Sequence, residues 1–401
     1  MMSGILVVLQ CGYSHNETVM RIKKRLYMLI FLASIFMLPA APSSVSAQVT
    51  CTGSACSLLP FSTQQFDQML WDFNYQYINV LMEDMGKAAI LTNMSSAPVG
   101  SVNLSGITFG GGVAAGYVEE HKVAVLLNGM GSITDIPSAG ANVIPRAYFG
   151  INLGKFVGRT YDPFKDSVDS KPSWISPGRF DVYLSLMNYK YEKNSEVQFN
   201  LMNNAPSLTE SFKASSNYMG ADLYYHLMEG KSFAGPLFGF LGLSVGVGMH
   251  DALQNIEYYK PDSKSVINLN GGTKLIWHAS DLATLNVRVR SNTAEIKTGI
   301  RFLYFFSLTG AVGSANNYGG ASLRYTRYGR LYLNNDLSAA LGLTIPDAWL
   351  SLNIVSEKEL PRRTNYKKVG LELNFAAFKI AFEGIQVGKD KGGSIGARFA
   401  F

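Results

Sequence analysis

From Gly106 to the C-terminus, apolar and polar side chains alternate with a period of two, which is typical of β-strands. In residues 237–249, apolar residues alternate mostly with small ones, and in residues 331–343 leucine and alanine alternate with tyrosine, asparagine, aspartate and serine. A polar strand face is costly to bury in a dry core, whereas a water-filled lumen hydrates it. The pattern therefore predicts an all-β fold, a transmembrane antiparallel β-barrel.

The spacing of these segments predicts fourteen strands, an even number as in bacterial single-chain barrels. Counting back from a periplasmic C-terminus places four short turns in the periplasm: residues 229–232, 279–281, 345–347 and 376–377. The same count places three longer polar segments outside: residues 192–214, 251–264 and 356–366. The long segment 157–178 does not fit this count: either it is an inward insertion, or residues 123–133 form a further strand.

Residues 57–96 have a different period, since large apolar side chains recur there every three to four positions. We predict one amphipathic helix of about twenty residues, with Ser62 or Thr63 as its N-cap. A helix ahead of a barrel lies either in the lumen as a plug or beneath the barrel as a cap. Residues 48–105 are therefore assigned to an N-terminal helical plug or cap, and residues 106–401 to the barrel.

Residues 1–47 have the layout of a secretory signal peptide. A basic stretch at residues 21–25 precedes an apolar run at residues 26–38, and Val45-Ser46-Ala47 supplies the small residues of a cleavage site. Met20 opens this pattern better than the first methionine. We therefore expect export, with a start at either methionine.

Composition narrows the class of protein. Charged residues are 16% of the chain, below the roughly 25% usual for soluble domains. No run of 18 apolar residues follows residue 47, so a helical membrane protein with several spans is excluded. The leader carries four basic and one acidic residue, which leaves 31 Lys and Arg against 28 Asp and Glu, and this balance predicts no nucleic-acid partner. In an oxidising compartment, Cys51 and Cys56 are candidates for a local disulfide.

Catalytic and cofactor motifs are missing from the sequence. It contains no G-x-S-x-G, no H-E-x-x-H and no phosphate-binding glycine loop. His226 shares a predicted face with Asp222 and Tyr224, and we interpret these as ordinary polar groups of the lumen. We therefore expect neither an enzyme nor a cofactor or metal site.

The clearest charged feature is a basic strip on the predicted inward faces of consecutive strands. Its members are Arg288, Arg290, Lys297, Arg301 and Arg324. A cationic wall favours anions in a pore. In the alternative interpretation, inward acidic residues neutralise it and form a closed polar network: Asp222, Asp336, Glu372 and Glu383. Arg327 and Arg330, at a predicted outer turn, suit binding of lipopolysaccharide phosphates.

The predicted outer loops offer a second candidate site, at Tyr258, Tyr259, Arg362 and Arg363. Charged and aromatic loop residues can contact a protein partner. Hydrated loops that bind nothing are equally compatible with this composition.

The last strand has an apolar stripe formed by Ile395, Ala397, Phe399 and Phe401. It resembles the C-terminal assembly signal of outer-membrane proteins. The resemblance implies that the barrel-assembly machinery is a partner and that the protein is localised in the outer membrane, in contact with its lipid and lipopolysaccharide.

The order of features also carries a family resemblance. A leader, Cys51 and Cys56, a helix through Phe73-Asn74-Tyr75-Gln76-Tyr77 and glycine-rich strands ending in Arg398-Phe399-Ala400-Phe401 resemble surface-exposed outer-membrane proteins of leptospiral spirochaetes, described as adhesins. This implies binding of host extracellular matrix or plasma proteins. A helix before about fourteen strands is also similar to outer-membrane transporters of hydrophobic compounds, so a channel for hydrophobic or anionic solutes is the alternative.

Overall fold

The computed structural model describes residues 46–95, 106–128, 131–154, 176–197, 208–228, 230–233, 237–268, 274–303, 305–334, 347–375 and 377–401. Contacts divide the chain after Pro42, and all of the described residues belong to the second unit, Ser43–Phe401. The predicted signal peptide lies outside the described residues, except for Ser46 and Ala47.

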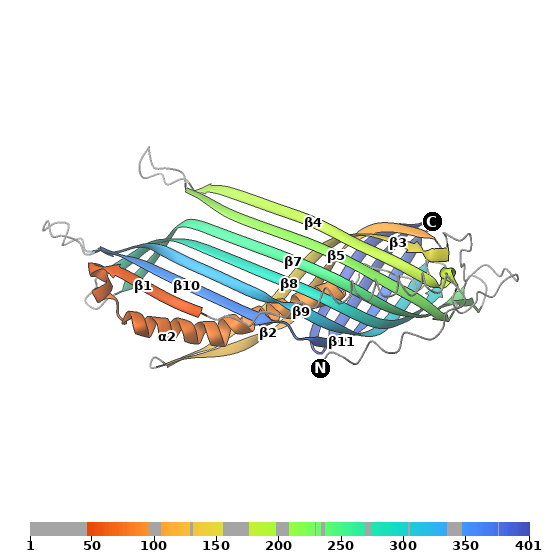
Figure 1. Cartoon of the computed structure of the whole chain (residues 1–401), viewed down its shortest axis with the longest axis horizontal. Coiled ribbons are helices and arrows are strands. Elements are labelled where there is room, and N and C mark those ends of the chain that lie inside the picture. Colours follow the sequence, from red (N-terminus) through yellow and green to blue (C-terminus); the bar gives the residue numbers. More distant parts are fainter. Residues whose placement is uncertain are drawn as a thin grey trace, which may run out of the picture. The chain divides into compact units, whose positions relative to one another are not determined.

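In these described ranges, thirteen strands form one antiparallel sheet (Figure 1). They are β1 (Ser46–Gly53), β2 (Ile107–Leu127), β3 (Gly131–Asn152), β4 (Phe180–Val197), β5 (Leu208–Met228), β6 (Lys231–Ser232), β7 (Phe238–Asn268), β8 (Lys274–Phe302), β9 (Phe306–Asn334), β10 (Asp347–Glu359), β11 (Arg363–Phe375), β12 (Phe378–Val387) and β13 (Asp390–Ala400). The helical segments are η1 (Ser54–Leu58), α2 (Thr63–Phe73), the π-helical η2 (Asn74–Ile78), α3 (Asn79–Met94) and η4 (Pro177–Arg179).

The sheet closes on itself. Starting at β9, the pairings run through β11, β12, β13, β2, β3, β4, β5, β7 and β8 and return to β9. The last residue takes part in closure, because Phe401 and Ile107 exchange two backbone hydrogen bonds of 2.9 Å each. The predicted antiparallel barrel with an N-terminal helix is therefore confirmed.

The predicted number of fourteen strands is wrong because several strands are much longer than expected. β7 has 31 residues, and β8 and β9 have 29 each. The predicted turn at residues 279–281 lies inside β8, and the predicted outer loop 251–264 lies inside β7. Residues 123–127 continue β2, and the outer segment 192–214 is largely the paired ends of β4 and β5. Asp347, predicted in a periplasmic turn, begins β10 at the opposite end from Phe401.

The third predicted outer loop, residues 356–366, is also part of the sheet. β10 and β11 pair with the same edge of β9 in one register, since Glu359 lies opposite Gly320 and Arg363 lies opposite Asn316. The break between them is short, and Leu360 N–H still donates to the Gly319 carbonyl at 3.2 Å. Gly319 has φ +115°, a conformation that favours glycine. The break turns the Leu360 side chain into the core, where it is 7% exposed.

Large apolar side chains point outward around the half of the ring that ends at Phe401. On β11 the outward residues from Val369 to Phe375 are apolar, and six residue steps cover about 20 Å along the strand. A transmembrane barrel presents to lipid an apolar band roughly 25 Å tall. We call this band the lipid belt. Its other exposed members include Phe109, Val113, Leu184, Leu186, Met219, Leu223, Val247, Met249, Ile296, Ile300, Leu308, Val312, Phe382, Ile395 and Phe399.

Beyond the belt the strands are unequal in length. β12 and β13, with 10 and 11 residues, end where the belt ends. β7 continues through residues 251–268, which adds about 60 Å along the strand. β8, β9 and β10 continue beside it, and β1 pairs with the outer edge of β10. We call this extension, formed by β1 and β10 and the far halves of β7, β8 and β9, the distal sheet.

The last part of the N-terminal helical path, α3, lies inside the barrel, as the plug interpretation predicts, whereas α2 packs beside β1 and β2. Ser62 caps α2 with a complete capping box, and the helical path continues through η2 into α3. Side chains of α3 pack in one core with residues of β8, β9, β11 and β12, including Leu91, Met94, Val289, Tyr366 and Ile385. On the opposite side the α3 backbone touches β2 and β3 so closely that only glycine fits at Gly116 and Gly140.

We predict that Gly140→Ala loosens the plug. A Cβ at this position would lie 2.1 Å from the Asp84 carbonyl oxygen, so α3 must shift. Overpacking of this kind costs about 1–3 kcal/mol. The unfolding midpoint, measured by heat-modifiable gel mobility, should fall, whereas Gly384→Ala, whose Cβ meets nothing closer than 3.9 Å, should leave it unchanged. Equal midpoints for the two variants would show that α3 is not seated on Gly140.

Candidate functional site

The interior of the belt is filled by a buried ionic network. Glu295 accepts hydrogen bonds from the Lys368 ammonium at 2.9 Å, Tyr224 Oη at 2.7 Å and Tyr366 Oη at 3.0 Å. Lys368 also lies 3.9 Å from Glu383. These residues come from several different strands, and the Glu295 and Lys368 side chains are at most 5% exposed. Buried charges of this kind are retained when they are paired and hydrogen-bonded.

A second buried pair lies nearer the C-terminal end of the barrel. Arg398 Nη2 donates to Glu372, and both side chains are 1% exposed. Lys379 lies 3.8 Å from the same carboxylate. The two clusters together occupy the lumen with side chains from several sides of the ring. This supports the closed polar network rather than an open cationic pore.

The predicted basic strip does not exist as a unit. Lys297 and Arg301 lie on the inner face of β8, where the Lys297 side chain is buried. Arg288 and Arg290 lie on the outer face and contact Asp251 at 3.4 and 2.8 Å. Arg324 is exposed on the outer face of β9. The prediction was wrong because it divided β8 into two strands; in one continuous strand, even and odd positions face opposite sides.

The end of α3 is fastened to the barrel wall by polar contacts. Arg146 donates to the carbonyls of Thr92 and Ser95, the last ones of the helix. A cation at the C-terminal end of a helix donates hydrogen bonds to carbonyls that have no partner within the helix, and its charge interacts favourably with the helix dipole. Asn93 Nδ2 lies within 3.3 Å of the His250 and Val289 carbonyls. The plug is therefore held by directional bonds as well as by apolar packing.

His226 is also part of this interior. Its Nε2 lies 2.8 Å from Asp181 Oδ2 and its Nδ1 lies 2.7 Å from Ser244 Oγ. Asp222, which shares its face as predicted, instead pairs with His250 at 3.1 Å. Ser244 and His226 are 0% and 1% exposed. A substrate therefore has no access to this group of side chains in the present conformation, and we interpret it as part of the packing of the lumen.

β12 and β13 do not extend beyond the lipid belt, so the barrel wall has a gap there, which we call the seam. One side of the seam is formed by β1 and β10, and the other side by β2. The π-helical segment η2 closes the seam. Gln76 Oε1 accepts from Leu126 N–H at 2.8 Å, and Gln76 Nε2 donates to the Leu126 carbonyl at 2.9 Å. On the other side, Asn74 Nδ2 donates to the carbonyls of Ser46 and Val355 at 3.2 and 3.0 Å. One helical turn therefore satisfies backbone groups of strands on both sides of the seam.

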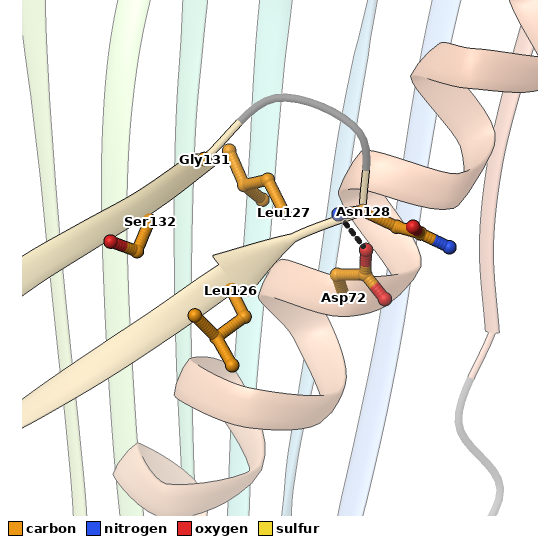
Figure 2. Close-up of a pocket in the computed structure, with 6 residues that line it drawn as sticks. All are labelled: Asp72, Leu126, Leu127, Asn128, Gly131 and Ser132. Carbon is orange, nitrogen blue, oxygen red and sulfur yellow. Dashed lines mark hydrogen bonds between the residues drawn. The ribbon is translucent and has the colours of Figure 1, made fainter.

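A surface pocket lies at the end of this seam, between α2 and the tip of the β2–β3 hairpin (Figure 2). Asp72 is the one ionisable residue in its lining. Its Oδ2 accepts from Asn128 N–H at 3.0 Å and its Oδ1 from Gln68 at 3.1 Å. Oδ2 links α2 to the hairpin tip and Oδ1 is used by a residue of the same helix, so both oxygens are already hydrogen-bonded and the pocket offers no evident chemistry. Its lining residues are Asp72, Leu126, Leu127, Asn128, Gly131 and Ser132.

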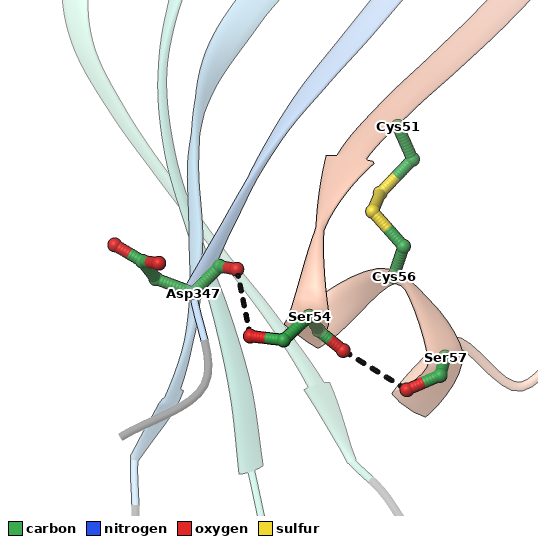
Figure 3. Close-up of a disulfide and its surroundings, with 5 residues drawn as sticks. All are labelled: Cys51, Ser54, Cys56, Ser57 and Asp347. Carbon is green, nitrogen blue, oxygen red and sulfur yellow. Dashed lines mark hydrogen bonds between the residues drawn. A yellow bond between two sulfur atoms is a disulfide. The ribbon is translucent and has the colours of Figure 1, made fainter. Parts of the chain in front are cut away.

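The candidate disulfide forms at the far end of β1 (Figure 3). The Cys51 and Cys56 sulfur atoms are 2.09 Å apart and the Cα atoms 5.8 Å. It joins β1 to η1, next to the Ser54 hydroxyl, which donates to the Asp347 carbonyl at 3.4 Å. The bridge therefore ties the N-terminal segment together where it turns from strand to helix.

Three of the four residues proposed for outer loops lie in strands instead. Tyr258 and Tyr259 are in the middle of β7, and Tyr258 Oη donates to Glu210 at 2.7 Å. Arg362 lies in the short break between β10 and β11, and Arg363 begins β11. The loop assignment was wrong because charged and aromatic residues on a water-exposed strand have the composition of a loop.

The two arginines proposed for lipopolysaccharide phosphates are engaged within the distal sheet. Arg327 points inward, donates to Ser265 Oγ at 2.7 Å and stacks on the Trp277 ring at 4.4 Å. Arg330 points outward and pairs with Asp347 at 2.7 Å. The predicted turn at these arginines is absent, because β9 runs through both.

A tyrosine beside Arg327 is also affected by its surroundings. Desolvation by burial raises the pKa of Tyr325 to about 12, and its hydrogen bond to Asp281 contributes to the shift.

The outer face of the distal sheet carries an exposed aromatic pair that the sequence pattern did not predict. Tyr328 on β9 and Trp349 on β10 stack with ring centroids 5.1 Å apart, and they are 49% and 51% exposed. The alternation of Trp349, Ser351 and Asn353 with buried Leu350 and Leu352 could have indicated an exposed tryptophan. The pairing of that tryptophan with Tyr328 depends on the register between the two strands, which the sequence does not give.

The described ranges contain neither a membrane-spanning helix nor a metal-binding cluster. No helix in them is both long and apolar enough to cross a membrane. Nor do they contain a group of three or more His, Cys, Asp or Glu side chains arranged to hold a metal ion.

We predict that Gln76→Ala opens the seam locally. The change leaves the N–H and carbonyl of Leu126 to water, and each lost hydrogen bond is worth about 0.5–1.5 kcal/mol. Hydrogen exchange at the Leu126 amide should accelerate. The control is Gln64→Ala, an exposed glutamine on the same helical path. Unchanged exchange in the Gln76 variant would mean that η2 does not protect this edge.

Comparisons with known proteins give a family and several distant structural matches. The translocator domain of autotransporter NalP from Neisseria meningitidis is 9% identical, with a TM-score of 0.27, covering 82% of this chain and 99% of that one. The Ralstonia pickettii toluene transporter TbuX is 10% identical, with a TM-score of 0.24, covering 80% and 99%. A Pseudomonas aeruginosa FadL homologue is 9% identical, with a TM-score of 0.24, covering 80% and 98%.

No curated protein matches the sequence. A family model described as Lsa36-like matches residues 44–401, which include the whole sequence after the predicted leader. The chain therefore belongs to the Lsa36-like family.

Proposed function

We propose that this protein is a surface-exposed outer-membrane barrel that acts as an adhesin for host extracellular matrix or plasma proteins. The observation that carries the proposal is the distal sheet. Its strands continue for about 60 Å beyond the lipid belt, far more than a membrane-spanning strand of roughly 9–11 residues needs. Such a length of sheet outside the bilayer is suited to presenting a binding surface.

The orientation that we propose places the distal sheet outside the cell. The ring is closed by the last strand, whose outward Ile395, Phe399 and Phe401 fit recognition by the barrel-assembly machinery from the periplasmic side. At the other edge of the belt, Lys367 and Lys391 lie on either side of Gln386 in one row of paired residues. Cations there are placed to meet lipopolysaccharide phosphates.

The filled lumen supports adhesion over transport. A channel for hydrophobic or anionic solutes needs a continuous path, whereas Glu295, Lys368, Glu372 and Arg398 are buried and paired within the lumen. Opening a path would separate these charges, and breaking a buried pair costs about 3–5 kcal/mol. The anchored α3 adds a second barrier.

The orientation is tested with two single cysteines on the outer face of β9. Arg324→Cys lies in the distal sheet, and Val312→Cys lies in the lipid belt, where Val312 is 55% exposed. A membrane-impermeant maleimide should label Arg324→Cys on intact cells and label Val312→Cys only after detergent is added. Labelling of Arg324→Cys only after the outer membrane is permeabilised would place the distal sheet in the periplasm.

Adhesion and transport are separated by two measurements on the purified protein. We expect saturable binding to immobilised matrix glycoproteins, and no conductance above background in planar bilayers because the lumen is filled. A steady conductance together with an absence of binding would contradict the proposal and favour the channel.

A further inference from the structure

The stacked pair of Tyr328 and Trp349 lies too far from the lipid belt for the membrane to cover it. Trp349 is twenty residues before Val369 along the continuous line of β10 and β11, or about 65 Å along the strand. Two exposed aromatic rings stacked side by side form a flat apolar patch that a partner can cover. The two rings are nearly parallel, with an interplanar angle of 16°, and lie on a sheet rather than in a cleft.

The surroundings of the pair are rich in hydroxyl and amide groups. Tyr328 lies opposite Ser280 on β8 and Ser351 on β10, and Trp349 lies opposite Thr52 on β1. An exposed aliphatic neighbour is Leu282, 38% exposed. The polar residues that share this outer face are Gln48, Thr50, Thr52, Ser280, Thr326, Ser351 and Asn353.

The charge at this surface is balanced. Arg330 lies opposite Trp349 and pairs with Asp347, which accepts from Arg330 Nε at 3.1 Å and from Nη2 at 2.7 Å. The pair is half-exposed, so it can exchange hydrogen bonds with a ligand. A strongly anionic ligand would find one cation already neutralised, which favours an uncharged partner.

We propose that Tyr328 and Trp349 form a binding platform for a neutral hexopyranose unit of a glycan. The apolar C–H face of the sugar ring stacks on the aromatic rings, and its hydroxyl groups bond to Arg330, Asp347 and the surrounding polar side chains. A protein hot spot differs, since its aromatic anchors enter a desolvated pocket ringed by further contacts. This inference rests on the proposed adhesin function and gives it a ligand class: the glycans of host glycoproteins.

The test uses the full-length protein on an array of immobilised neutral glycans. Wild type should bind at least one hexose-terminated glycan, and Trp349→Ala and Tyr328→Ala should each weaken that binding at least tenfold. Tyr318→Ala is the matched control, because Tyr318 is 45% exposed on the same face of β9 but pairs with Arg290 outside the platform. Heat-modifiable gel mobility confirms that each variant is folded.

A matrix glycoprotein with and without its glycans separates this inference from the adhesin function. Binding that disappears on deglycosylation and in Trp349→Ala supports the platform. Equal binding to both forms, or a Trp349→Ala variant that binds glycans like wild type, overturns the platform and leaves the adhesin function standing. Binding to neither form overturns both.

Discussion

The structure depends on one constraint: every backbone N–H and carbonyl within a bilayer needs a protein partner, so the sheet has to close. Closure is achieved in the belt by ten strands, and the terminal residue bonds to the first residue of β2. Because β12 and β13 are short, strand pairing cannot close the sheet beyond the belt. There the chain uses side chains of η2 as substitutes for a neighbouring strand, with Gln76 bonding to both backbone groups of Leu126.

The N-terminal segment is linked to the barrel in two ways, because it both closes the seam and fills the lumen. The same helical path that closes the seam continues as α3 into the lumen, where Arg146 and Asn93 fix its end. A π-helical turn widens the helix by one residue and often marks a functional position. Here it places Asn74 and Gln76 toward opposite sides of the seam. One continuous helical segment therefore both closes the seam and plugs the lumen. Moving the plug out of the lumen would also break the hydrogen bonds that close the seam.

The sequence predicts the class of fold well because period-two alternation reports directly on the two faces of a strand. The N-cap at Ser62, the disulfide and the outward stripe ending at Phe401 follow from equally local signals. Strand length is harder, because polar residues on a water-exposed strand look like a loop. That single ambiguity moved Tyr258 and Tyr259 into a loop and divided β8, which put Arg288 and Lys297 on one face. The Tyr328 and Trp349 pair depends on register between β9 and β10, a long-range property that alternation leaves undetermined.

A cross-strand disulfide tests the closed ring most directly. Phe109 and Phe399 lie opposite each other on β2 and β13, with ring centroids 5.5 Å apart. The double variant Phe109→Cys and Phe399→Cys should form a bridge in the folded membrane protein under mild oxidation, seen as a mobility shift that reductant reverses. If the bridge forms only after unfolding, or not at all, then β13 and β2 are not neighbours and the sheet is open.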